Sequence, residues 1–100
     1  GVLRFTTMLE AATAAGFEVA IHSLFETGIG TAANLHLARA FPEIRRANDS
    51  GLHVLARDVI ATPLSIVAGS MAVPDGPGLG VTLDEAAMTD LTIQTAEIAR

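Results

Sequence analysis

Helical and extended patterns alternate along the first half of the chain, and this order constrains the fold more than any other feature. Apolar residues recur at helical spacing from Leu3 to Ala15, and a short strand-like stretch, Phe17 to His22, follows Gly16. A second helical pattern runs from Ile29 to Phe41, and Arg45 to Ser50 can supply a second strand. About 29 residues separate corresponding strand positions, which is the length of a β/α unit with parallel strands.

One or two parallel strands cannot close a sheet, and the first helix has no strand before it in these residues. We therefore expect an α/β fold in which the chain is the C-terminal part of a larger barrel. Residues 1–63 would form the last β/α units of that barrel. Residues 64–100 would form a separate C-terminal segment.

The second half of the chain contains turn signals and short apolar runs. Leu64 to Ala68 and Met71 to Val73 are expected to be strands joined by a tight turn at Gly69-Ser70. Val81 to Leu83 is expected to be a short strand, and Asp84 to cap a helix that begins Glu85-Ala86-Ala87. Residues 91–100 fit a strand or a helix equally well.

Composition excludes several classes of function for these residues. All six basic residues are Arg and face eleven Asp and Glu, so there is no basic patch for nucleic acid or an anionic membrane. The absence of Lys and Cys excludes a Schiff base, a P-loop and a thiolate nucleophile. No uncharged run is long enough to span a bilayer as a helix.

Only 17% of residues are charged, against about a quarter in typical domains. Part of the apolar surface is therefore expected to face more protein, the alternative being a composition rich in Ala.

Polar side chains at the ends of the two expected strands are the candidates for chemistry, because functional groups of α/β barrels lie there. His22, Ser23 and Glu26 follow the first strand, and Asn48 and Asp49 end the second. Structural alternatives stay open for two of them. The carboxylate of Glu26 can cap the helix that begins near Ile29, because the positive end of a helix stabilises a negative charge. Asp49 can form an Asx turn that leads into Gly51.

The three histidines do not have metal-ligand spacing. His36 lies on the apolar face of its helix, where a hydrogen-bonded structural role is expected, and His53 is expected in a loop or at the surface. His22 is the one candidate for a general base. The glycines at 76, 78 and 80 do not form a dinucleotide-binding motif.

Two stretches carry a family resemblance, SLFETGIGTAANLHLA over residues 23–38 and PDGPGLGVTLD over residues 74–84. Together they resemble the C-terminal region of the mandelate racemase and muconate lactonizing enzyme family, in the enolase superfamily. The resemblance implies a modified TIM barrel, (β/α)7β, with a tail that returns to an α+β capping domain. It also implies an enzyme that removes the proton α to a small carboxylate substrate, with Mg²⁺ stabilising the enediolate.

The family's carboxylate metal ligands and catalytic lysines would lie upstream of Gly1, so no metal site is expected in this segment and the isolated segment is not expected to be active. Glu26 matches a glutamate that faces the active site in the muconate lactonizing branch, and Asp49 an acidic position of the eighth strand. These two are the expected catalytic residues, with His22, Ser23 and Asn48 expected to contact substrate. Compared with the racemase branch, His22 is displaced by one residue, which would turn it away and put Ser23 in the site.

The resemblance leads us to expect a racemase, cycloisomerase or dehydratase, cytoplasmic and homo-oligomeric, whose partners are its substrate and the rest of its own barrel, without nucleic acid or membrane. The alternative is a non-catalytic, barrel-derived interaction module whose apolar surface binds a partner.

Overall fold

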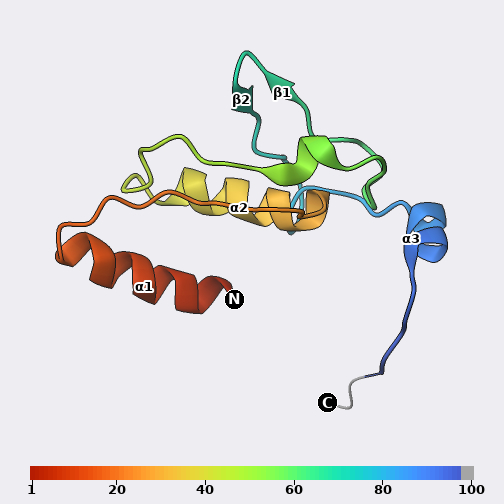
Figure 1. The fold of residues 1–100 in the computed structure, drawn as a ribbon, viewed down its shortest axis with the longest axis horizontal. Coiled ribbons are helices and arrows are strands. Elements are labelled where there is room, and N and C mark those ends of the chain that lie inside the picture. Colours follow the sequence, from red (N-terminus) through yellow and green to blue (C-terminus); the bar gives the residue numbers. More distant parts are fainter. Residues whose placement is uncertain (98–100) are drawn as a thin grey trace.

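The computed structural model describes residues 1–97 (Figure 1). Its helices are α1 (Val2–Ala14), α2 (Gly28–Ala40) and α3 (Glu85–Leu91), with a short 3-10 helix, η1, at Gly51–Val54. Strands β1 (Ile66–Val67) and β2 (Ser70–Met71) form an antiparallel hairpin. In the view of Figure 1, α2 lies at the centre, with α1 on one side, the hairpin on the other and α3 at one end.

The three expected helices are confirmed to within a residue or two. α1 ends before Gly16, which takes a φ of 83°, and the amide of Phe17 bonds back to the carbonyl of Ala12. α2 ends at Ala40, just before Pro42. Asp84 caps α3, since its Oδ1 accepts from the amide of Ala87 at 2.9 Å.

The strand predictions are only partly correct. Residues 17–22 and 45–50 are extended but do not form ladders among the described residues, because a single main-chain hydrogen bond joins them. The hairpin turn is at Ala68-Gly69, one residue before the expected Gly69-Ser70, and the expected strand at 81–83 is reduced to one bridge between Ile60 and Leu83. Residues 92–97 are neither helix nor strand, and residues 98–100 of the ambiguous terminal stretch lie outside the described part.

A small hydrophobic cluster joins the two helices to the two extended segments. Leu9 of α1, Ile21 and Ile44 are each less than 10% exposed. Phe5, Val19, Leu37, Ala38 and Phe41 pack around them. Since α1, α2 and both segments all contribute to this cluster, it fixes the segments against the helices and so places the residues at their ends.

Candidate functional site

The two extended segments, residues 17–23 and 44–50, run side by side in the same direction. Near their starts Arg46 pairs with Glu18, and near their ends the amide of Asp49 donates to the carbonyl of Ile21 at 2.9 Å. The amide of Ile21 in turn donates to Oδ1 of Asn48 at 2.8 Å. Because both segments end at the same edge, the side chains that follow them are brought together there.

His22 and Asp49 meet at this edge. Nδ1 of His22 lies 2.9 Å from Oδ2 of Asp49, and the two side chains are 65% and 64% exposed. The two atoms are close enough to form an ion pair when the imidazole is protonated. An imidazole held in this way can accept a proton from a bound molecule.

Ser23 lies on the opposite side of its segment from His22. It is 5% exposed, like Ile21 two residues earlier, and its Oγ has no hydrogen-bond partner in the structure. Alternate side chains of an extended segment point to opposite faces, which explains this arrangement. It is therefore His22, and not Ser23, that meets the carboxylate of Asp49. A contact between Ser23 and substrate stays a prediction.

Glu26 is placed with α2 rather than in the His22–Asp49 pair. Its Oε2 accepts a hydrogen bond from Nδ2 of Asn34 at 2.8 Å. The amide of Gly28 at the start of α2 bonds to Asp58 and not to Glu26. The carboxylate of Glu26 nevertheless lies against the first turn, 2.8 Å through Oε2 from where a Cβ at Gly30 would be, as the structural alternative of an interaction with the positive end of the helix requires. Glu26 thus lies half-buried in the loop between residues 23 and 28, at the end of the first segment.

Asp49 does not make the Asx turn considered as its structural alternative. The turn into η1 is formed by Ser50, whose Oγ accepts weakly from the amide of Leu52 at 3.4 Å. Asp49 is consequently free to hold His22, and its neighbour Asn48 ties the two segments together.

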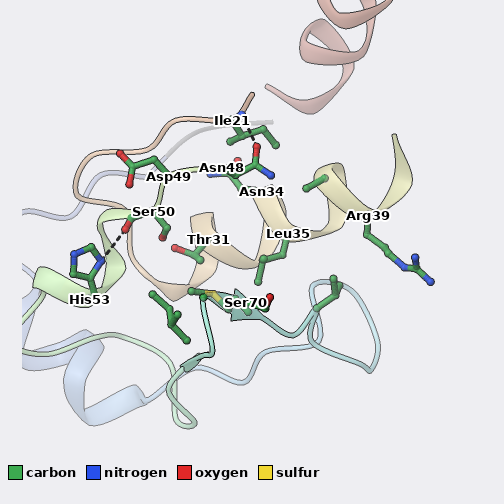
Figure 2. A pocket seen from close by; sticks show the side chains of 15 residues that line it. Ile21, Thr31, Asn34, Leu35, Arg39, Asn48, Asp49, Ser50, His53 and Ser70 are labelled. Carbon is green, nitrogen blue, oxygen red and sulfur yellow. Dashed lines mark hydrogen bonds between the residues drawn. The ribbon is translucent and has the colours of Figure 1, made fainter. Parts of the chain in front are cut away.

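A cavity of about 470 Å³ lies between α2, residues 48–53 and the hairpin (Figure 2). Its polar lining includes Asn34, Asn48, Asp49, Ser50 and His53. Thr31 also lines it, 3% exposed, and its Oγ1 has no partner in the structure. Asn48 and Asp49 border this cavity, whereas His22, Ser23 and Glu26 do not.

The other two histidines each lie within hydrogen-bond distance of a main-chain carbonyl. Nε2 of the half-buried His36 lies 3.1 Å from the carbonyl oxygen of Leu79, which confirms the expected hydrogen-bonded role. His53 is exposed on η1, 2.9 Å through Nδ1 from the carbonyl of Ser50. Over residues 1–97, no three side chains of the metal-binding types come together as a ligand set.

Sequence patterns missed Thr31 and Asp58. Thr31 belongs to the helix entrance Gly28 to Thr31, and nothing in that pattern shows that its hydroxyl is left without a partner. Asp58 contacts a residue 30 positions earlier in the chain, a pairing that no local pattern reports.

Comparison with known proteins places this geometry in a family. Residues 1–87 match the family described as enolase C-terminal domain-like. The chain is 40% identical over 85 residues to a probable glucarate dehydratase of Streptomyces coelicolor, covering 84% of this chain and 20% of that protein. It is 34% identical over 79 residues to a chloromuconate cycloisomerase of Cupriavidus pinatubonensis, covering 78% of this chain and 21% of that protein.

A solved structure agrees with these matches. The crystal structure of an enolase from Streptomyces coelicolor, described as a putative sugar isomerase, superposes with a TM-score of 0.85 at 36% identity. The match covers 90% of this chain and 24% of that one. The chain belongs to the enolase C-terminal domain-like family of the enolase superfamily, whose fold is an α/β barrel of the TIM type. It spans about a fifth of the length of the curated relatives that it matches.

Proposed function

We propose that the chain is the C-terminal part of an enzyme that removes the proton α to the carboxylate of a small substrate. The relatives support this class, because a glucarate dehydratase and a chloromuconate cycloisomerase both act on carboxylates although their overall reactions differ. Racemase and dehydratase reactions begin with this proton removal. A cycloisomerase forms the corresponding enolate by ring closure and then protonates its α-carbon, so proton transfer at the carbon α to the carboxylate is common to all three outcomes. The proposal therefore names the shared step.

The His22–Asp49 pair is the observation that carries the proposal. A proton α to a carboxylate is weakly acidic, so the base that removes it must be held in place and supported electrostatically. Nδ1 of His22 lies 2.9 Å from Oδ2 of Asp49, so the carboxylate would stabilise the imidazolium that forms when His22 accepts the proton. Glu26 and Ser23, from the same segment and the loop after it, together with Asn48, would shape the pocket around the substrate.

Members of the enolase superfamily generally use Mg²⁺, but the described residues do not fit a Mg²⁺ site. No three carboxylates or imidazoles converge across residues 1–97, and the carboxylates of Glu26 and Asp58 already accept N–H bonds within the chain. We propose that the metal's ligands and the catalytic lysines lie outside these hundred residues.

We further propose that residues 1–63 are the last β/α units of a (β/α)7β barrel and that 64–100 return toward a capping domain. The open edges of the two extended segments support this, because each needs neighbouring strands that residues 1–97 do not supply. A free-standing interaction module is less well supported. Such a module needs a core of its own, and no large side chain is fully buried in the described part of the chain.

Cytoplasmic location and homo-oligomerisation stay predictions from the family. Within residues 1–97, none of the helices combines the length and apolar character needed to cross a membrane.

The test uses the full-length protein. Incubation with glucarate, muconate and chloromuconate in deuterium oxide, followed by NMR, is expected to show turnover or deuterium exchange α to a carboxylate for at least one of them. Absence of exchange with every carboxylate tried would contradict the proposal.

Glu26→Gln tests whether the loop takes part. The amide oxygen of Gln can still accept from Asn34, so the fold should be retained while the charge is lost. Turnover is expected to fall well over ~10-fold, the usual scale for a charged group near the transition state. Glu10→Gln, on the exposed face of α1, is the matched control and should leave turnover unchanged. Unchanged kinetics in Glu26→Gln would remove Glu26 from the site.

A further inference from the structure

The start of α2 is held by a residue that lies far along the chain. Thr27 precedes the helix without making a side-chain cap, and the first turn contains no acidic residue. Instead the amide of Gly28 donates to the carboxylate of Asp58, 2.9 Å from both oxygens. A carboxylate at this end of a helix satisfies an unpaired amide and interacts favourably with the helix dipole.

Asp58 is itself firmly held. Its Oδ1 accepts from the amide of Val59 at 2.7 Å, which fixes the side chain over its own backbone. The segment that follows is pinned to residues 82–84, because the amide of Asp84 bonds to the carbonyl of Val59 and the amide of Ala61 to that of Thr82. The backbone that carries Asp58 is therefore held in place.

Asp58 and Ile60 pack against the first residue of α2, Gly28, without free space between them. A Cβ at Gly28 would lie 2.2 Å from Cδ1 of Ile60 and 2.6 Å from Oδ2 of Asp58. Ile60 is 4% exposed, so it cannot swing into solvent without opening the core. Any shift of Asp58 would consequently be passed on to the first residue of α2.

The loop that carries Glu26 is thus fixed at both of its ends. At one end Gly51 packs directly on the carbonyl of Leu24, and at the other Asp58 holds Gly28. Glu26 lies between them and is joined to Asn34. We propose that Asp58 is a positioning residue for the active-site loop, which it clamps from downstream so that Glu26 faces the substrate in one fixed orientation. This inference rests on the proposed function.

The test compares three variants of the full-length protein. Asp58→Ala removes both acceptors, whereas Asp58→Asn keeps one oxygen that can accept from Gly28. Asp84→Ala is the matched control, since Asp84 also caps a helix, α3, and lies on the backbone paired with Val59, yet it does not contact the loop. The measurements are kcat and KM on whichever of glucarate, muconate or chloromuconate is turned over, and amide hydrogen exchange by mass spectrometry.

We expect Asp58→Ala to lower kcat/KM by at least ~10-fold, the scale of a misplaced active-site group, and Asp58→Asn to restore most of that loss. Asp84→Ala should stay within about 2-fold of the original enzyme, because its cap is remote from Glu26. Equal losses in Asp58→Ala and Asp84→Ala, or no rescue by Asp58→Asn, would overturn the proposal and leave Asp58 a purely structural cap.

Hydrogen exchange keeps the test independent of the proposed function. Asp58→Ala should speed exchange of the amides from residue 24 to residue 31, and Asp84→Ala only that of α3. If no carboxylate is turned over, faster exchange in the loop of Asp58→Ala still supports the clamp, and unchanged exchange there overturns it.

Discussion

The exposure of the His22–Asp49 pair separates its role in stability from its role in chemistry. About two-thirds of each side chain is accessible, at 65% and 64%. Exposed pairs contribute about 0–1 kcal/mol to the free energy of unfolding. A pair that contributes so little to folding but places a carboxylate beside an imidazole is better explained by a role in proton transfer.

Asp49→Ala is therefore expected to change the free energy of unfolding of the full-length protein by less than ~1 kcal/mol while lowering kcat at least ~10-fold. The loss would come from an imidazolium that no longer has a carboxylate beside it. Denaturant titration and steady-state kinetics provide the two measurements. Glu18→Ala is the control, because the Glu18–Arg46 pair joins the same two segments with similar exposure, 64% for Arg46 and 70% for Glu18. Equal loss of kcat in the two variants would show that Asp49 has no special role.

Gly51, unlike the His22–Asp49 pair, is expected to matter for stability, because the backbone of Leu24 leaves no room for a side chain at this position. A Cβ at this position would lie 1.2 Å from the carbonyl oxygen of Leu24, so Gly51→Ala must push the backbone of the loop away. We expect the full-length protein to lose about 3 kcal/mol or more of unfolding free energy, the range of severe packing defects. Gly16→Ala is the comparison, because Gly16 has a φ of 83° but open space around it, and should cost about 1 kcal/mol. Similar costs for both would mean that the contact with Leu24 relaxes easily.

At the scale of the element, the helices and the hairpin could be predicted to within a residue or two, whereas the strands expected at residues 17–22 and 45–50 could not. The ends of the helices depend on local backbone geometry and on hydrogen bonds between residues close in sequence, as at Gly16, Pro42 and Asp84. A local sequence pattern can therefore predict them. Residues 17–22 have the composition of a buried strand, but a ladder needs a run of main-chain hydrogen bonds to a neighbouring strand, and among the described residues 45–50 supply only one.

The hairpin turn gives a testable case of this local control. Ala68 and Gly69 both have positive φ, 49° and 77°, the pattern of a type I′ turn, and only Gly69 suits it. Ala68→Asn should raise the unfolding free energy by about 0.5–1 kcal/mol, since Asn adopts this conformation more readily than Ala. Thermal unfolding of the full-length protein measures the change, with the exposed Ala72→Asn as the control outside the turn. A stabilisation of the same size in both variants would show that the turn is not its source.

For the whole molecule, the family could be predicted from the sequence of residues 23–38 and 74–84, but the arrangement of the candidate site could not. Alternation along residues 17–23 places His22 and Ser23 on opposite sides, yet only the packing of Ile21 against Leu9 and Ile44 decides which side faces the helices. The contact between Asp58 and Gly28 likewise depends on chain segments 30 residues apart. Such pairings are set by the tertiary fold and leave no local pattern.

The exposed surface of the chain argues that it does not fold by itself. Its accessible surface is 7648 Å², whereas a compact monomer of 10.3 kDa exposes about 5,400 Å². Its radius of gyration of 15.2 Å likewise exceeds the ~13 Å of a compact domain of this length. Large apolar side chains account for part of the excess, with Leu3, Phe17, Leu24 and Phe25 between 66% and 83% exposed.

A polypeptide of residues 1–100 alone is therefore expected to aggregate or to melt without a cooperative transition, because too little apolar surface is buried to offset the loss of chain entropy. Size-exclusion chromatography and the thermal circular dichroism of the isolated segment measure this, with the full-length protein as the reference that should melt cooperatively. A soluble monomer of 10.3 kDa with a sharp melting transition would favour a free-standing interaction module. The expected result, in contrast, means that Phe17, Leu24 and Phe25 are covered by other parts of the same protein and that the His22–Asp49 edge is one wall of a site that the rest completes.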